Sequence, residues 1–161
     1  MKAIILAAGK GERLGKITDD TPKPMIIVDG KPILQHNIEL CKKYGIDEIY
    51  ITLHHLPIII SDYFGDGERF GIKIKYIFEK NLLGTSGAVK NISNRDSYFT
   101  NNPFYVLYGD NYSNYNLKSL ISNHIVTIAF HQIKDVTNSG VAEFDKNNKI
   151  ISFIEKPKGN I

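Results

Sequence analysis

Short apolar runs alternate along the chain with stretches whose apolar residues recur at helical spacing. Apolar runs that end at glycine or polar residues predict buried strands, and four of them cover residues 2–8, 48–53, 72–79 and 103–110. Helical spacing predicts helices over residues 32–45, 57–64 and 84–92. Strands that alternate with helices indicate an α/β sandwich with a mostly parallel sheet.

The remaining segments follow the pattern less regularly. Residues 26–34 predict a short strand, a turn at Asp29–Gly30 and the start of the first helix. Residues 116–124 read as a helix and residues 125–133 as a strand. Residues 140–157 read as two strands joined by an Asp/Asn-rich turn, which predicts a hairpin.

Polar residues cluster where three of the predicted strands end. The clusters are residues 9–13, 79–84 and 109–111. Because ligands of parallel α/β sheets bind at the carboxyl ends of the strands, this coincidence predicts a binding site at that edge.

Composition and charge narrow the functional class. The chain has 161 residues, 42% of them hydrophobic, which suits one globular domain with its own core. A net charge of +3 without clustered lysine and arginine argues against a partner nucleic acid. The first apolar run is too short for a signal sequence, and residues 49–60 carry two histidines and a proline. We therefore expect no membrane span and a cytoplasmic protein.

Cysteine and histidine usage argues against disulfides and zinc. Cys41 is the single cysteine, which excludes an internal disulfide, and its place on an apolar helical face predicts a buried core thiol. His54 and His55 are adjacent at a strand end, where neighbouring side chains point to opposite faces. A zinc site at this pair is therefore not expected.

The stretch "LAAGKGERLG" (residues 6–15) has the composition of a phosphate-binding loop. It departs from the G-x-G-x-x-G dinucleotide fingerprint, because Leu14 replaces the third glycine and the prolines that follow forbid the required helix. It also departs from a P-loop, because five residues separate Gly9 from Gly15 and no Ser or Thr follows Lys16. Neither a nicotinamide enzyme nor a P-loop NTPase is expected.

The same stretch, with "TPKP" after it, resembles the sequence signature of the sugar-1-phosphate nucleotidyltransferases. The resemblance continues in the family's order at "LLGTSGA", "LYGDN" and "FIEKP" and spans residues 2–157. It is closest to the branch that acts on mannose or heptose 1-phosphate with GTP. The resemblance implies a Rossmann-like three-layer α/β sandwich with a mixed, mostly parallel sheet.

The implied reaction transfers a nucleotidyl group from an NTP to a sugar 1-phosphate and releases pyrophosphate. Such chemistry needs cations, bare backbone amides and a carboxylate for a metal ion. By the resemblance, Arg13 would bind the β- and γ-phosphates and Lys23 the α-phosphate. Asp110 would bind Mg²⁺, the expected cofactor. Arg13, Lys23 and Asp110 are therefore the expected catalytic residues.

The nucleotide site is expected to combine the glycine-rich loop with residues near the third predicted strand. A carboxylate at Glu79 would accept hydrogen bonds from guanine N1–H and N2–H₂ together, which favours GTP, although a strand-end Glu79 also reads as an ordinary solvated residue. The expected nucleotide-binding residues are Leu6, Ala7, Ala8, Gly9, Gly11, Arg13, Lys23, Glu79 and Gly84.

The sugar side is expected to involve the second half of the chain. Glu155 would accept hydrogen bonds from sugar hydroxyls, and Lys156 would pair with the sugar's phosphate. Thr85 starts a predicted helix, where it would meet an anion or sugar hydroxyls, act as an N-cap, or do both. The expected sugar-phosphate-binding residues are Thr85, Asn111, Gly140, Glu155 and Lys156.

Two other interpretations stay open. One is a thymidylyl- or uridylyltransferase of a sugar phosphate; the other is a regulatory relative that binds nucleotide without chemistry. Such relatives usually lose the arginine or the metal-binding aspartate, and Arg13 and Asp110 are both present.

The extent of the resemblance bears on domain organisation. The family's pattern continues past "FIEKP" with a second aspartate that shares the metal. We therefore expect residues 1–161 to be a single catalytic-core domain truncated at its C-terminus, as a fragment or as a short natural relative. Members of the family are often oligomers, so a homo-oligomer is compatible with the resemblance.

Overall fold

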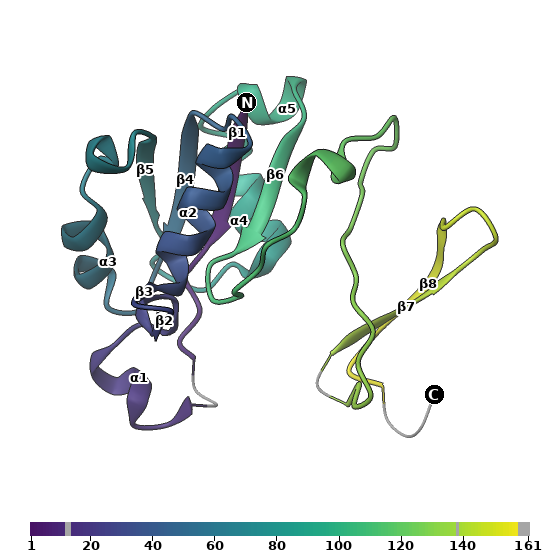
Figure 1. Ribbon diagram of the computed structural model, residues 1–161, viewed down its shortest axis with the longest axis horizontal. Coiled ribbons are helices and arrows are strands. Elements are labelled where there is room, and N and C mark those ends of the chain that lie inside the picture. Colours follow the sequence, from purple (N-terminus) through teal and green to yellow (C-terminus); the bar gives the residue numbers. More distant parts are fainter. Residues whose placement is uncertain (12–13, 138, 158–161) are drawn as a thin grey trace. The chain divides into compact units, whose positions relative to one another are not determined.

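A computed structural model describes residues 1–11, 14–137 and 139–157 of the chain (Figure 1). The chain divides into two compact units, Met1–Lys118 and Ser119–Ile161. The predicted pocket-forming strands all belong to the first unit, and the predicted hairpin belongs to the second.

The first unit is built on a sheet of four parallel strands in the order β5-β4-β1-β6. The strands are β1 (Lys2–Leu6), β4 (Glu48–Leu53), β5 (Lys73–Phe78) and β6 (Phe104–Tyr108). β1 lies between β4 and β6, and Leu6 at its end is in register with Thr52 and with Tyr108. The predicted α/β fold with a mostly parallel sheet is confirmed; antiparallel pairs among the described residues occur only outside this sheet.

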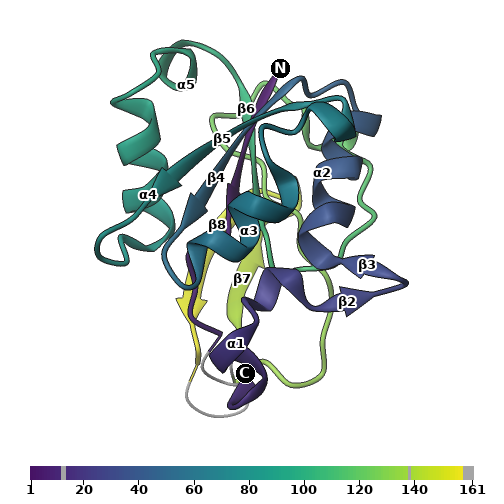
Figure 2. The same ribbon diagram turned by 90° about the vertical axis from the view of Figure 1, so that its left-hand side faces the viewer.

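Helices cover both faces of the sheet and complete the three layers (Figure 2). One face carries α2 (Ile33–Lys43) and α3 (Pro57–Phe64), and the other carries α4 (Gly84–Ser93) and α5 (Tyr98–Asn101). The order of strands requires this division, because right-handed crossovers to the left and to the right of β1 place their helices on opposite faces.

Alternation along the strands supplies the core on each face. Ile4, Tyr50 and Ile77 form one buried cluster with Ile92 of α4 and Phe99 of α5. The opposite face receives the apolar stripes of the other two helices. Their buried residues include Leu34, Ile38 and Cys41 of α2 and Ile60 and Phe64 of α3. Burial raises the pKa of the Cys41 thiol to about 12, as expected of a core thiol.

Short elements connect β1 to α2. They are α1 (Ile17–Asp20), a 3-10 helix at Lys23–Met25, and the antiparallel pair β2 (Ile27–Val28) and β3 (Lys31–Pro32). Asp29 and Gly30 between the last two have positive φ, which is the turn predicted there. Two further 3-10 helices are Glu68–Phe70 and Leu117–Leu120.

No helix among the described residues is long and apolar enough to cross a bilayer.

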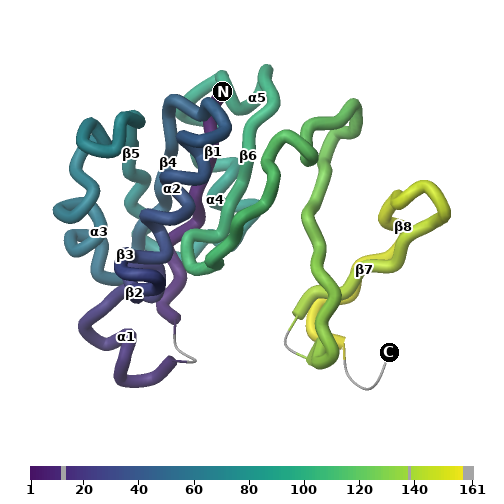
Figure 3. The backbone as a smooth tube through the Cα atoms, viewed as in Figure 1, coloured from purple at the N-terminus to yellow at the C-terminus, as the bar shows by residue number. Residues whose placement is uncertain are grey.

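The second unit contains the predicted hairpin, formed by β7 (Gly140–Phe144) and β8 (Ile150–Glu155) (Figure 3). The strand predicted over residues 125–133 is wrong. No described strand forms backbone ladder hydrogen bonds with this segment, and Ile125 and Val126 are 104% and 69% exposed. A β-strand needs a neighbour to take its backbone hydrogen bonds, and periodicity alone does not supply one. The helix predicted over residues 116–124 is too long, because the structure has a short 3-10 helix there, at Leu117–Leu120.

A network of charged side chains lies at the end of the sheet where the four strands begin. Glu48 pairs with Lys2 of the neighbouring strand at 2.9 Å and with Lys75 at 3.1 Å. Lys2 also pairs with Asp96 at 2.6 Å, and Asp96 accepts a hydrogen bond from the Tyr50 hydroxyl. Burial by itself raises the pKa of Glu48, but the hydrogen bonds from Lys2 and Lys75 outweigh it and lower the pKa to about 2. Hydrogen bonds from Lys2 and then Tyr50 likewise hold the pKa of Asp96 well below its usual range.

The network predicts acid-sensitive stability. Because folding lowers the Glu48 pKa from its ordinary 4.5, the stabilisation is complete above pH 4.5 and is lost as the pH falls toward 2. We expect Glu48→Gln to lower the free energy of unfolding by about 2 kcal/mol at neutral pH, and the gap from wild type to shrink below about pH 5. Urea unfolding at a series of pH values measures it. Asp62→Asn, which changes an exposed carboxylate of α3, should follow the wild-type curve; a Glu48→Gln gap that is constant with pH would contradict the prediction.

Candidate active site

A pocket of about 290 Å³ lies in the first unit where the four parallel strands end. Leu6, Thr52 and Tyr108 come from the last residues of β1, β4 and β6, and Glu79 directly follows β5. The binding edge predicted from the polar clusters therefore coincides with a pocket. Of the predicted site residues, the pocket brings together Leu6, Ala7, Ala8, Gly9, Gly11, Lys23, Glu79, Gly84, Thr85 and Asp110.

Five pocket residues were not predicted from the sequence. They are Pro24, Thr52, Leu82, Ala88 and Tyr108. Thr52 and Tyr108 could have been predicted as pocket residues, because both lie at the carboxyl ends of predicted strands. Leu82 and Ala88 belong to the "LLGTSGA" motif, but as apolar residues they carry no charge or hydrogen-bonding group that would mark them as pocket residues.

The glycine-rich loop keeps one wall of the pocket free of side chains. Gly11 has a φ of +70°, and a Cβ there would lie 2.9 Å from Thr18 Cγ2 and 3.2 Å from Lys23 Cβ. Gly9 differs, because its φ is not in the left-handed region and a Cβ there would meet no atom within 4 Å. Glycine at position 11 is thus required by the fold, whereas at position 9 it leaves open space in the pocket. Arg13, the predicted arginine of this loop, lies outside the described residues.

Lys23 and Asp110 form an ion pair inside the pocket. Lys23 Nζ lies 2.6 Å from Asp110 Oδ2, and the two side chains are 27% and 33% exposed. Pro22 and Pro24 flank the lysine in a short 3-10 helix, which fixes its backbone. Asp110 follows β6 by two residues. A cation and a carboxylate thus stand next to each other beside a loop of bare backbone, as phosphate and metal binding require.

Glu79 is almost completely buried, at 6% exposure, and is only partly satisfied. Its Oε2 accepts a hydrogen bond from the Leu83 amide at 3.1 Å, but its buried Oε1 has no partner among the residues that the structure describes. The carbonyl oxygen of Glu79 also contacts His54 Nδ1 at 2.8 Å, which fixes the strand end. A solvated strand-end residue is therefore not what the structure shows. Glu79 is instead a buried carboxylate that lines the pocket and retains unused hydrogen-bonding capacity among the described residues.

The start of α4 forms another part of the wall. Gly84, with a φ of +68°, is the first residue of the helix, and Thr85 Oγ1 lies 3.3 Å from the Tyr108 hydroxyl. Leu83 occupies the N-cap, and no side chain caps the helix. The N-cap interpretation of Thr85 is therefore wrong, and its hydroxyl faces the residues of the pocket.

The described residues contain no group of three or more His, Cys, Asp or Glu side chains that could hold a metal ion. His54 and His55 each contact a backbone carbonyl oxygen instead, of Glu79 and of Thr18 respectively. A metal ion in this pocket would depend on one carboxylate, Asp110, together with oxygen atoms of a ligand and water. Mg²⁺ commonly has such a ligand set, so the donors that are present fit it.

The predicted sugar-side residues lie mostly in the second unit. Gly140 begins β7 and is in register with Glu155 at the end of β8, and the Lys156 amide donates to the Ser139 carbonyl oxygen at 3.0 Å. A Cβ at position 140 would lie 2.4 Å from Phe153 Cζ, so a larger residue there would require the Phe153 ring to shift. In the first unit, Asn111 is exposed and is not one of the pocket residues.

Comparison with known proteins gives consistent results. The family described as Nucleotidyl transferase matches residues 2–161. D-glycero-alpha-D-manno-heptose 1-phosphate guanylyltransferase of Campylobacter jejuni is 40% identical, over 97% of this chain and 69% of its own length. UTP–glucose-1-phosphate uridylyltransferase of Synechocystis is 39% identical, over 98% of this chain and 44% of its own. The crystal structure of HddC from Yersinia pseudotuberculosis complexed with GMP-PN superposes with a TM-score of 0.75 at 28% identity, over 98% of this chain and 70% of that one.

These matches run through both units, although the chain spans less than half of the Synechocystis relative's length. A family match over nearly the whole chain agrees with the parallel sheet and with the pocket at its carboxyl edge. The chain belongs to the nucleotidyl transferase family, in the group of sugar-1-phosphate nucleotidyltransferases.

Proposed function

We propose that the protein transfers the guanylyl group of GTP to a mannose- or heptose-like sugar 1-phosphate, with Mg²⁺ as cofactor. The observation that carries the proposal is the Lys23–Asp110 pair at 2.6 Å, in a pocket whose glycine-rich wall leaves room for phosphates. The 40% identity to a heptose 1-phosphate guanylyltransferase supports the same choice of substrates.

In the proposed reaction, a phosphate oxygen of the sugar 1-phosphate forms a bond to the α-phosphorus of GTP. The bond from that phosphorus to the oxygen bridging the α- and β-phosphates breaks, and pyrophosphate leaves with the electron pair. Lys23 would donate hydrogen bonds to the α-phosphate oxygens, on which negative charge gathers in the transition state. Arg13 would bind the departing β- and γ-phosphates.

Asp110 would hold Mg²⁺, and the bound ion would neutralise charge on the phosphate oxygens. In the structure the same Asp110 Oδ2 pairs with Lys23. Asp110 thus has the charge and position to bind a cation, and Lys23 is the cation it binds here. In the proposed complex, Asp110 would bind Mg²⁺ and Lys23 would bind phosphate. Each side chain would then have a more highly charged partner than it has here.

Glu79 would determine which base the site prefers. Turned toward the pocket, its carboxylate would offer two acceptors, the now unpaired Oε1 and the second lone pair of Oε2, and these would match the adjacent N1–H and N2–H₂ donors of guanine. Uracil and thymine offer one donor between two acceptors and would leave a carboxylate oxygen facing a carbonyl. The uridylyltransferase relative supports the competing choice of UTP, so the base has to be tested directly.

The proposal retains the other expectations from the sequence. Gly140, Glu155 and Lys156 would bind the sugar phosphate together with Thr85 and Asn111. A single catalytic-core domain, a cytoplasmic location and a homo-oligomer remain predictions. A regulatory relative without chemistry is disfavoured, because Lys23 and Asp110 are both in place in one pocket.

The metal assignment predicts the effect of removing one charge. We expect Asp110→Asn to lower the rate of pyrophosphate release by at least about a hundredfold, because the proposed metal loses its carboxylate. Mg²⁺-dependent binding of GTP, followed by thermal shift, should be lost as well. The matched control is Asp62→Asn on α3. Wild-type rate and Mg²⁺ dependence in Asp110→Asn would overturn the assignment.

The base assignment predicts a change in nucleotide preference. We expect the protein to be stabilised by GTP more than by UTP or dTTP, and Glu79→Gln to reduce the ratio of GTP to UTP affinity by about tenfold or more. The reason is that an amide accepts only one of the two guanine donors and offers its own donor to uracil. Calorimetric titration with the three nucleotides measures it, with Glu68→Gln at an exposed position as the control. An unmodified protein that prefers UTP or dTTP contradicts the choice of GTP.

The two loop glycines should respond differently to a methyl group. We expect Gly9→Ala to keep the wild-type melting temperature, because its Cβ meets no protein atom, yet to weaken GTP binding by about tenfold through contact with the phosphates. Gly11→Ala should instead lower the melting temperature, since its φ is +70° and its Cβ would collide with Thr18. Thermal unfolding with and without GTP separates the two effects. Unchanged GTP affinity in Gly9→Ala would exclude phosphates from this wall.

A further inference from the structure

Asn37 is a fully buried polar residue that the proposed mechanism does not use. It lies in α2, where the other buried residues are Ile33, Leu34, Ile38, Leu40 and Cys41. Position 37 therefore belongs to the stripe that packs on the sheet, where helical periodicity calls for an apolar side chain. A polar residue in such a place breaks the local pattern, and breaks of this kind are concentrated at functional sites.

The Asn37 side chain binds the turn that carries Asp110. Its Nδ2 lies 3.2 Å from the carbonyl oxygen of Tyr108, 3.4 Å from that of Gly109 and 3.1 Å from that of Asn111. These carbonyls stand on both sides of Asp110 in the chain. The orientation of the amide follows from chemistry, because the reverse orientation would put Oδ1 against three oxygen acceptors.

The other half of the same amide is unpaired within the described part of the chain. Oδ1 of Asn37 is buried and makes no hydrogen bond to any described residue. An unpaired buried acceptor costs free energy, so asparagine is a poor choice for core packing alone. What the residue supplies in return is the Nδ2 donor to the turn after β6.

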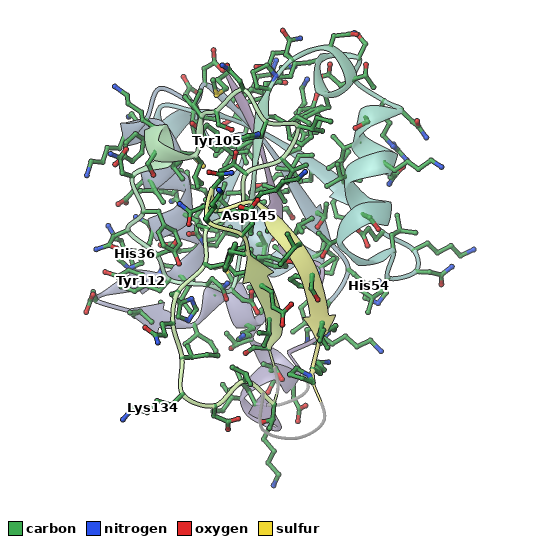
Figure 4. The ribbon with its side chains drawn as sticks, turned by 90° about the vertical axis from the view of Figure 1, so that its right-hand side faces the viewer. His36, His54, Tyr105, Tyr112, Lys134 and Asp145 are labelled. Atoms are coloured by element: carbon green, nitrogen blue, oxygen red, sulfur yellow. The ribbon has the colours of Figure 1, made fainter. Side chains whose placement is uncertain are left out.

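Two further contacts hold the same turn. The Gly109 amide donates to the Leu6 carbonyl oxygen at 2.8 Å, which ties the turn to β1. A Cβ at position 109 would lie 3.1 Å from both Ala7 Cβ and the Leu6 oxygen, so the turn passes very close to that strand. On the α2 side, the ring of His36 meets the ring of Tyr112 edge-on at 4.7 Å, and the two residues lie side by side (Figure 4).

We infer that Asn37 is a positioning residue for Asp110: by binding the backbone on both sides, it holds the carboxylate where Lys23 reaches it and where Mg²⁺ would bind. The inference rests on the proposed function for the role of Asp110. Lys23 reaches Asp110 through its side chain, whereas Asn37 holds the backbone from within the core. Loss of Asn37 therefore frees the turn without removing any group that touches substrate.

The test combines two variants of Asn37 with a control on the same helix. Asn37→Leu replaces the amide by an apolar side chain of similar size, and Asn37→Asp keeps the shape but removes the donor. Leu34→Ala, at an equally buried position one turn earlier, measures ordinary core destabilisation. Each protein is examined by amide hydrogen exchange without metal or nucleotide, by thermal unfolding, and by the Mg²⁺ concentration that half-saturates GTP binding.

We expect both Asn37 variants to speed exchange of the Gly109 and Asn111 amides by about tenfold relative to the amides of β6. Half-saturating Mg²⁺ should rise by about tenfold or more, the usual effect of removing a group that orients a metal ligand. Leu34→Ala should lower the melting temperature while keeping the wild-type Mg²⁺ requirement and the relative exchange of the turn.

Three results would overturn the positioning role while the proposed function stands. The first is wild-type exchange of the turn in both Asn37 variants, and the second is an unchanged Mg²⁺ requirement in both, in each case with Asp110→Asn losing Mg²⁺-dependent binding. A rise in the Mg²⁺ requirement of Leu34→Ala equal to that of Asn37→Leu would also overturn it. The failure of the proposed function is seen separately, as wild-type Mg²⁺ dependence in Asp110→Asn itself.

Discussion

The parallel pairing of β1 with β4 on one side and β6 on the other is the constraint on which the site depends. The register places Leu6 beside both Thr52 and Tyr108, so three strands end at the same level. A slip of one residue would turn every side chain to the opposite face and would carry the glycine loop away from Asp110. The buried cluster around Ile4 makes such a slip costly, because it depends on strict alternation between the faces.

The two edges of this sheet use charge in opposite ways. Where the strands begin, Glu48 and Asp96 are saturated by Lys2, Lys75 and the Tyr50 hydroxyl, and both carboxyl pKa values are lowered. Where the strands end, one oxygen of the buried Glu79 has no hydrogen-bond partner among the described residues, and Asp110 pairs with Lys23. The first edge is arranged for stability, and the second leaves hydrogen-bonding capacity for a ligand. This contrast is what distinguishes a structural ion network from a binding site in the same sheet.

The two sides of the proposed reaction are separated along the chain. The nucleotide side is a pocket within the first unit, so its argument rests on distances between residues that the structure brings together. The predicted sugar-side residues Gly140, Glu155 and Lys156 meet one another in the hairpin of the second unit. Their role is argued from the family to which the chain belongs, in which relatives match both units.

The sequence by itself determined the class of fold, the strands of the parallel sheet and most residues of the pocket at its carboxyl edge, because these depend on local periodicity and on motifs whose residues are close in the chain. Residues 125–133 show the limit, since their apolar pattern is strand-like but no described residue pairs with them. Only the tertiary structure decided that Lys23 and Asp110 touch and that Asn37 binds the turn around Asp110. Lys23 and Asp110 are 87 positions apart in the chain, and Asn37 and Asn111 are 74 apart. Such contacts depend on how strands and helices pack, so no periodic pattern in the sequence indicates them.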